Sequence, residues 1–469
     1  MDRYYQNPDV RNRLVDYSGG SGGHHPTCAY LSQCDGTLYS PAALRPPSEL
    51  DWFLEQGEEV ARSLCDTDSL LVHFDMEYVN FDSPTYAFTE PHRAFEVQEP
   101  AVEAVEELLL SWGIRPLHLV TGQGHHFVWR IPLGSAVERS LRRLAPVSDW
   151  ARHSHPGPHP QLPPPVPDHV VAAFSGLGLV MEYLASQARV LASSRSGLPV
   201  DITAVTPGPP AAGAPREIVS LDISEYGDPI HTRTIRMPFT RYRKPWRTGM
   251  ADQLQDGCTI PPMFCVPLHE MDVFQALEMR RDESEVASLA MRASTEIPEE
   301  STGMARLVAE YLASPLRRFH DWFYLVDQHP EDRWPETYHL ALAPLHPAPP
   351  CTRHVLNYPN DLLLKPAGIQ LVVRSFVALG WHPRHISGLI RARFCDPAAG
   401  WGDTWEHYDP GIRAEFYTRL FAGQLATGLD GLLDFNCTST QEKGFCFNAG
   451  GGCNLGPFHD KIPENLPTL

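Results

Sequence analysis

Short apolar runs, bounded by turn-forming residues, predict the strands in the first half of the chain. The run LLVHFDMEYVNF (70–81) is rich in strand-forming residues. The segment LHLVTGQGHHFVWRI (117–131) predicts a strand, a glycine turn and a second strand, and REIVSLDIS (216–224) predicts a return to strand.

Segments with a longer hydrophobic period predict helices between and after these strands. One helix is expected over about 47–65, with Ser48 as its N-cap, and another over 99–113, with acids early and Gly113 as its stop. The pattern is helical again from about 271 to 325. Strand, helix, strand and hairpin in this order indicate an α/β (α+β) fold with a mixed sheet.

The chain divides into four regions, and its 469 residues lead us to expect two or three domains. An irregular, Gly/Ser-rich segment covers 1–46, and the α/β domain covers 47–260, with a Pro-rich surface insertion at about 153–168. A helical linker region covers 261–345. The remainder, 346–469, is expected to be a mostly helical, Cys-rich domain.

The composition narrows the class of protein. A formal net charge of −19 argues against a simple polyanion-binding protein. No apolar run of membrane-spanning length and no secretory signal are found, so we expect a soluble, cytoplasmic protein without a membrane partner. In such a protein the ten cysteines are expected to be free thiols or metal ligands rather than disulfides.

One stretch departs from this acidic balance. Residues 231–249 (HTRTIRMPFTRYRKPWRTG) carry arginines and a lysine, no acid, and aromatic residues between the bases. A basic strip on an acidic protein favours a phosphate-rich ligand held at one place. The alternative is a charged strand that faces solvent.

Two carboxylates lie inside the first predicted strand. Asp75 and Glu77 are two residues apart, so their side chains share one face of the strand. Like charges this close need a cation between them or access to water. Their type and spacing suit Mg²⁺ or Mn²⁺, whereas an edge strand with this face in water is the plain alternative.

The predicted hairpin adds groups that suit a phosphate. Gly122 and Gly124 allow a tight turn that exposes backbone N–H groups, and Thr121 offers a hydroxyl. His126 can donate a hydrogen bond to a phosphate oxygen, while His125 is expected on the opposite face. An ordinary hairpin is the alternative interpretation.

A third carboxylate, Asp222, ends the strand predicted at 216–224, directly before the basic strip. It could complete a set with Asp75 and Glu77, and Asp201 is a rival for the same role. Carboxylates that hold two metals, together with arginines and a lysine, are the components of nucleotidyl transfer.

These motifs in this order resemble the archaeo-eukaryotic primase superfamily, over roughly residues 48–250, and most closely the primase small catalytic subunit. The resemblance implies that Asp75, Glu77 and Asp222 bind catalytic metals and that the second motif binds the phosphates of the incoming nucleotide. The chain departs from the family at Tyr242, where a histidine is usual. Positions that match the nucleotide-binding motifs are Thr121, Gly122, Gly124, His126, Arg236, Pro238, Thr240 and Lys244.

The C-terminal region resembles the iron–sulfur domain of the primase large subunit, because PAPPCTRHVLN begins it and a Gly/Cys-rich segment ends it. Four thiolates suit a [4Fe–4S] cluster, with zinc as the alternative and Cys395 as a spare ligand. Unrelated buried cysteines are the other interpretation. The proposed ligands are Cys351, Cys437, Cys446 and Cys453, and a separate N-terminal zinc set could use His24, His25, Cys28 and Cys34.

The leading functional hypothesis is a DNA-directed nucleotidyltransferase, a primase or primase-polymerase. It would use NTPs or dNTPs on a single-stranded DNA template and would work near the nucleoid with a helicase or other replication proteins. The rival enzyme is a two-metal nuclease, because a D-x-E strand also occurs there. The rival non-enzyme is an accessory nucleic-acid-binding subunit.

Overall fold

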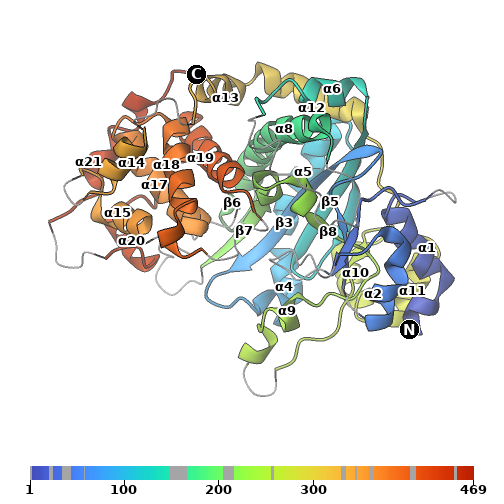
Figure 1. Cartoon of the computed structure of the whole chain (residues 1–469). Helices are drawn as coiled ribbons and strands as arrows, with labels where there is room; N and C mark the ends of the chain where they lie inside the picture. The colour runs from blue at the N-terminus through green and yellow to red at the C-terminus, as the bar shows by residue number, and fades with distance from the viewer. Residues whose placement is uncertain are drawn as a thin grey trace.

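The computed structural model describes residues 3–20, 25–33, 44–57, 59–147, 166–203, 216–254, 258–328, 334–343, 346–358, 363–401, 408–447 and 452–469. The Pro-rich insertion expected at about 153–168 falls almost wholly outside these ranges. The described chain is a mixed α/β structure with a mixed sheet (Figure 1).

A six-stranded sheet with the order β6-β7-β3-β5-β4-β9 forms the centre of the fold. All neighbours are antiparallel except β6 and β7, which are parallel, so the predicted mixed sheet is confirmed. The long strand β3 is central and pairs with β5 on one side and β7 on the other. The strands are β3 (Ser69–Asn80), β4 (Leu117–Val120), β5 (Gly124–Pro132), β6 (Val200–Ile202), β7 (Glu217–Asp222) and β9 (Val266–Pro267).

The N-terminal segment, expected to be irregular, contributes regular structure. Helix α1 (Pro8–Tyr17) begins at Asn7, whose side chain accepts from the next turn. Strand β1 (Leu31–Gln33) pairs with β2 (Val60–Ser63), which in turn pairs with β8 (Thr234–Arg236) in a second sheet. The partners of these short strands are distant in sequence, so no local sequence pattern predicts the strands.

The helix expected over 47–65 is shorter than predicted. A 3-10 turn, η4 (Pro47–Glu49), leads into α2 (Leu50–Gln56), and Ser48 is not its N-cap. Gly57 ends the helix with a left-handed φ of 66°. Residues after it form β2, because they bond to strands on both sides.

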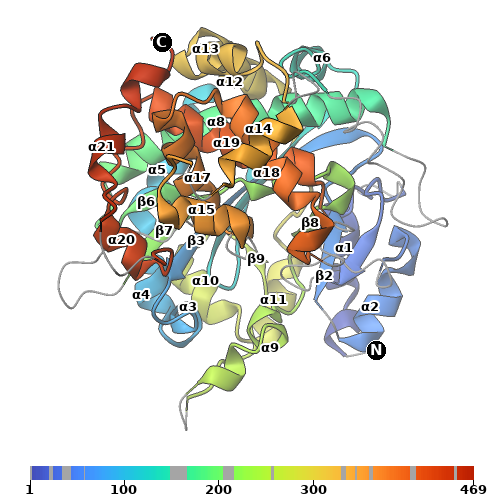
Figure 2. The same cartoon turned by 60° about the vertical axis from the view of Figure 1, so that its left-hand side comes forward.

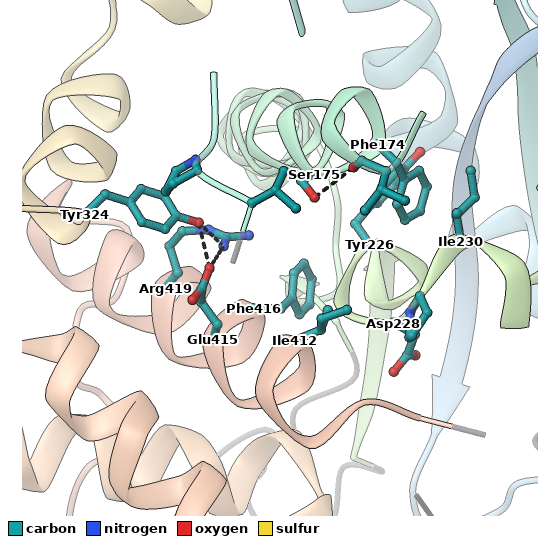
Figure 3. Close-up of a pocket in the computed structure, with 14 residues that line it drawn as sticks. Phe174, Ser175, Tyr226, Asp228, Ile230, Tyr324, Ile412, Glu415, Phe416 and Arg419 are labelled. Atoms are coloured by element: carbon teal, nitrogen blue, oxygen red, sulfur yellow. Dashed lines mark hydrogen bonds and ion pairs between the residues drawn. The ribbon is translucent and has the colours of Figure 1, made fainter. Parts of the chain in front are cut away.

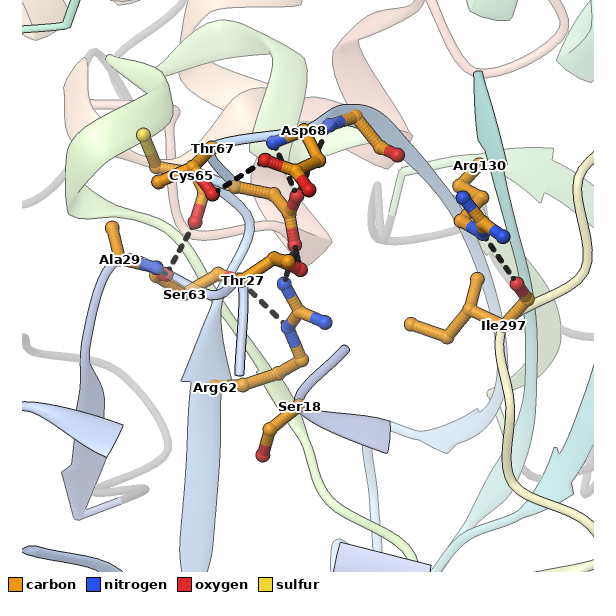
Figure 4. A network of polar contacts seen from close by, with 12 residues as sticks. Ser18, Thr27, Ala29, Arg62, Ser63, Cys65, Thr67, Asp68, Arg130 and Ile297 are labelled. Carbon is orange, nitrogen blue, oxygen red and sulfur yellow. Dashed lines mark hydrogen bonds and ion pairs between the residues drawn. The ribbon is translucent and has the colours of Figure 1, made fainter. Parts of the chain in front are cut away.

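A buried ion pair joins this N-terminal part to the main body. Arg62 on β2 lies 2.6 Å from Asp66, and both side chains are almost fully buried. Arg62 also donates to the Tyr17 carbonyl of α1 at 2.7 Å, and Asp66 accepts from the Thr27 hydroxyl at 2.7 Å. Figure 4 shows Arg62 and Thr27 in this network. Because each charge is paired and hydrogen-bonded, the network fixes α1 and the following loop against β2.

Helices from several parts of the chain pack against the six-stranded sheet. The helix predicted at 99–113 is confirmed as α5, with Gly113 at its left-handed C-terminal cap, and residues 271–325 are largely helical, as expected. Because β9 belongs to the sheet, the sheet extends past the boundary expected at residue 260. Besides α1 and α2, the described helices up to residue 325 are α3 (Tyr86–Thr89), α4 (Pro91–Glu96), α5 (Glu99–Trp112), α6 (Ala136–Leu141), α8 (Asp168–Ser193), α9 (Lys244–Arg247), α10 (Val273–Met279), α11 (Glu283–Ala290), α12 (Ser301–Ala313) and α13 (Pro315–Phe323).

The C-terminal helices gather beside the β6 edge of the sheet, away from the N-terminal helices (Figures 1 and 2). A buried ion pair, Arg419 on α19 with Glu182 on α8 at 2.5 Å, holds them to the body. These helices are α14 (Trp334–Ala341), α15 (Pro350–Asn357), α17 (Pro366–Ala378), α18 (Pro383–Phe394), α19 (Pro410–Ala426), α20 (Cys437–Glu442) and α21 (Gly456–His459).

Helix α8 is long and apolar enough, by length and composition alone, to cross a membrane. This differs from the expectation that no run in the chain reaches that length. Most of its apolar stretch is buried against other elements, including α5 and β6. Such burial is typical of the core helix of a soluble protein.

Candidate active site

Three strands place the predicted carboxylates and the histidine in one row. In the sheet register Asp75 of β3 lies directly opposite His126 of β5 and directly opposite Asp222 of β7. Directly opposed residues on neighbouring strands project from the same face. Residues 75, 126 and 222, widely separated in sequence, are therefore neighbours, and we call them the carboxylate row.

Glu77 extends the carboxylate row along β3. It lies opposite Gly124 and Ser220, on the same face as Asp75. Its Oε2 accepts a 2.5 Å hydrogen bond from the Gln123 amide, and its Oε1 lies 3.6 Å from Nζ of Lys244. Lys244 of the basic strip thus supplies part of the positive charge that the two neighbouring carboxylates require.

The two aspartates of the row are electrostatically strained. Burial raises the pKa of Asp75 well above its usual value, and the charges of Glu77 and Asp222 raise it further. Burial and the Glu225 charge likewise raise the pKa of Asp222. Negative charge gathered in a buried place is what a bound cation would neutralise.

An unsatisfied oxygen lies at the centre of the row. Asp75 Oδ1 is buried and has no hydrogen-bond partner among the described residues. His126 Nε2 is 3.5 Å from it, longer than a good hydrogen bond. His126 Nδ1 is also buried without a described partner, and burial holds the His126 pKa well below its usual value, with His73 lowering it further. The neutral imidazole keeps one donor, which suits a phosphate oxygen.

The glycine turn after β4 is closed by its own atoms. Thr121 donates both its N–H, at 2.8 Å, and its hydroxyl, at 3.1 Å, to the Gly124 carbonyl. The Thr121 hydroxyl proton is thus engaged within the turn, and the contact of this hydroxyl with a phosphate stays a prediction. At Gly124 an added Cβ would lie 1.9 Å from the Met76 carbonyl oxygen, and at Gly122 it would meet the Tyr242 ring. Both glycines are required by close approach.

A buried arginine supports this turn from behind, and no sequence motif indicates it. Arg280 donates to the Thr121 carbonyl and, at 3.4 Å, to the Gly122 carbonyl. Its guanidinium stacks 5.2 Å from the Phe95 ring, and burial lowers its pKa to about 10. The turn's carbonyls are thereby held toward Arg280.

The basic strip is organised around one buried acid, Glu59. Arg236 bonds to the Glu59 carboxylate, Arg243 donates its backbone N–H to it at 2.9 Å, and Arg247 lies 3.8 Å from it. Arg236 also stacks 4.5 Å above the ring of Tyr242. One buried carboxylate thus holds several residues of the strip in place.

Two other residues of the basic strip, Thr240 and Lys244, make different contacts. Thr240 is fully buried, and its hydroxyl donates to the Met237 carbonyl at 2.8 Å within a local turn; its contact with a nucleotide stays a prediction. Lys244 is close to Glu77. Burial lowers the Lys244 pKa, but Glu77, Tyr242 and Asp75 together outweigh that effect, so the pKa is raised and the ammonium stays charged.

A histidine and a glutamate join the face without having been predicted. His73 lies two residues before Asp75 on β3, and its ring meets that of His126 edge to face at 4.6 Å. Glu225 lies 3.1 Å from His73 Nδ1. The i−2 spacing from Asp75 could have indicated His73, whereas no local signal indicates Glu225.

Asp201, the rival third carboxylate, is engaged elsewhere. It lies on β6 opposite Ser220, one strand beyond Asp222, and pairs with Arg189 at 3.4 Å. Burial raises its pKa to about 6. Asp222 is the carboxylate directly opposite Asp75.

The four predicted C-terminal cysteines line one small cavity. Cys351 comes from α15, Cys437 from the start of α20, and Cys446 and Cys453 from the segment after it. Burial raises the Cys351 pKa to about 11, and Cys446 raises it further. Residues distant in sequence are thus brought to one place. Across the described residues, however, no three His, Cys, Asp or Glu side chains already form a closed metal site, either here or at the carboxylate row.

None of the other described cysteines lines this cavity. Cys395 is exposed beyond α18 and is not among the cavity's lining residues. In the N-terminal set, His24 and Cys34 lie outside the described residues, and Cys28 is buried with its pKa raised to about 11 by burial.

Comparisons of the chain with models of known families, with curated proteins and with solved structures find no match. What the site can do is therefore argued from its own residues.

Proposed function

We propose that this protein is a two-metal nucleotidyltransferase that extends or starts a strand on single-stranded DNA, as a primase or primase-polymerase does. The carrying observation is the carboxylate row, with Asp75, His126 and Asp222 in register and Lys244 alongside. Acid, imidazole and ammonium groups on one face match the needs of a metal-bound triphosphate.

The residues fit a hard divalent cation such as Mg²⁺ or Mn²⁺. Asp75 offers a buried oxygen without a hydrogen bond, and Asp222 and Glu77 offer oxygens beside it. When bound, such ions activate the attacking hydroxyl and neutralise the triphosphate. His126 would donate a hydrogen bond to a phosphate oxygen. The Lys244 ammonium would pair with the phosphates instead of with Glu77.

The donor set in the C-terminal cavity fits an iron–sulfur cluster, with zinc as the alternative. Four cysteines around one cavity match the usual ligand number of either group. We propose that this group holds α15 and the segments around α20 together and that the C-terminal region contacts the template or the first nucleotide.

Two rival functions predict different products. A nuclease would use the same metals to cleave the template. An accessory binding subunit would gain from losing acids beside phosphate, and the buried carboxylate row disfavours it.

The purified chain, incubated with single-stranded DNA, Mn²⁺ or Mg²⁺ and labelled nucleotides, separates these functions. We expect labelled product of increasing length. Shortened template without new product would favour the nuclease, and unchanged template and nucleotides would favour the binding subunit. Parallel reactions with NTPs and dNTPs would identify the preferred substrate.

The raised pKa values of Asp75 and Asp222 predict how cation binding depends on pH. A carboxyl group with a higher pKa in the folded state keeps its proton where the unfolded chain has lost it. The contribution of these two groups to the stability of the metal-free protein therefore falls as pH rises above about 4. Because cations bind the ionised form, Mn²⁺ should raise the melting temperature more at pH 8 than at pH 6. A Mn²⁺ concentration a hundredfold above Kd would stabilise the folded protein by about 2.7 kcal/mol. Equal shifts at both pH values would contradict the site.

Replacing one cavity thiol tests the C-terminal group. We expect Cys351→Ser to lose most of the bound iron and the absorbance at about 400 nm, because its thiolate is a ligand of the cluster. Cys395→Ser is the matched control and should retain both, since it lies outside the cavity. A colourless wild-type protein that holds zinc would reject the iron–sulfur assignment.

A further inference from the structure

The turn that follows Asp222 ties the carboxylate row together. It consists of the 3-10 helix η5 (Ser224–Gly227) and Asp228. Its first N–H, from Ser224, donates to Asp222 Oδ1 at 2.9 Å. The Tyr226 hydroxyl donates to the His73 carbonyl at 2.8 Å and accepts from the His73 N–H at 3.2 Å. The turn therefore fixes β7 against β3 beside the row.

The far end of the same turn is held by α19. Gly227 packs so closely on Phe416 that an added Cβ would lie 2.5 Å from the ring. Asp228 has a fully buried side chain and pairs with Arg413 of α19 at 3.3 Å and with Arg233 at 2.5 Å. The two arginines supply the charge that a buried carboxylate needs.

Figure 3 shows this junction from the side of a pocket between the turn, α8 and α19. Tyr226 and Asp228 come from the turn, and Ile412 and Phe416 from α19. Arg413 is itself held, because its guanidinium stacks 4.6 Å from the Tyr408 ring. It is a fixed anchor rather than a mobile surface charge.

We propose that Arg413 is a positioning residue for the metal-binding carboxylates. By fixing Asp228, it fixes the turn whose Ser224 orients Asp222. The inference rests on the proposed metal site and adds that the site is completed by a helix of the C-terminal region. The rival role of this ion pair is only to hold α19 to the body, as the pair of Arg419 with Glu182 does.

Metal affinity distinguishes positioning from simple docking. Binding of Mn²⁺ alone to the full-length chain, without nucleotide, is measured from the paramagnetic resonance signal of free Mn²⁺. Groups that orient metal ligands typically change affinity by about 10–100-fold when removed. We therefore expect Arg413→Gln to weaken Mn²⁺ binding about tenfold. Arg419→Gln, the matched control on the same helix, should change it less than about twofold.

Each result has a clear meaning. Absence of Mn²⁺ binding by the wild-type chain would reject the proposed metal site, and the inference with it. Wild-type binding with unchanged affinity in Arg413→Gln, or an equal loss in Arg419→Gln, would reject positioning by Arg413 alone. If Arg413→Gln does not fold, Asp228→Asn replaces it, because it keeps the side-chain shape. Wild-type affinity in Asp228→Asn would overturn the inference, and weakened affinity in a folded protein would support it.

Discussion

Asp75→Asn should slow nucleotide incorporation about a thousandfold while making the metal-free protein more stable. The substitution removes a carboxylate that lies between His126 of β5 and Asp222 of β7. One oxygen of this carboxylate is buried and has no described hydrogen-bond partner. Loss of about 4 kcal/mol of transition-state stabilisation corresponds to roughly a thousandfold slower reaction. Stability should rise in EDTA because a buried charge repelled by Glu77 and Asp222 is gone.

Both effects are measured on the same preparation, by primer synthesis with Mn²⁺ and by thermal melting in EDTA. Asp82→Asn is the matched control, because Asp82 lies two residues after the end of β3, is exposed and pairs with Arg216. It should keep activity and melt within a few degrees of the wild type. An active Asp75→Asn variant would remove Asp75 from the metal site, whatever its stability.

Gly124→Ala should cause the largest loss of stability. The new Cβ would lie 1.9 Å from the Met76 carbonyl oxygen and 2.8 Å from the Cα of Glu77. Both atoms belong to the backbone of β3, so relief requires β3 and β5 to separate where Glu77 is held. We expect a loss of about 3 kcal/mol in the free energy of unfolding, measured by urea denaturation.

Two other glycines calibrate that result. Gly197→Ala is the control, because no atom lies within 4 Å of its added Cβ, and its effect should stay within about 0.5 kcal/mol. Gly122→Ala should fall between them, because its Cβ meets the Tyr242 ring, a side chain that can shift. A neutral Gly124→Ala would contradict the close approach of the two strands.

The sequence predicts the strands that carry the site and the carboxylates on them. Alternation in residues 70–81 identifies a face with Asp75 and Glu77, and the sheet register then confirms that His126 and Asp222 join that face. Local patterns suffice here because each strand has its own hydrophobic period and turn signals.

The sequence does not predict which polar groups are already used by the fold. Thr121 and Thr240 have the right type for a ligand, yet each hydroxyl closes a local turn. Conversely, Arg280 and Glu225 reach the site from elements that no motif marks. The same limit hides β1, β2 and β8, since their pairing is set by distant partners rather than by neighbours in sequence.

The order of strands in the central sheet has a consequence for folding kinetics. Neighbours β3, β5 and β7 bring together residues 75, 126 and 222, so the carboxylate row depends on contacts of high sequence separation. Such contacts close large loops and form slowly. A chain emerging from the ribosome cannot assemble the row before β7 has been synthesised, so nascent chains that end before residue 217 lack one wall of the site. When the denatured protein refolds, the recovery of Mn²⁺ binding should therefore lag behind the recovery of the helical signal.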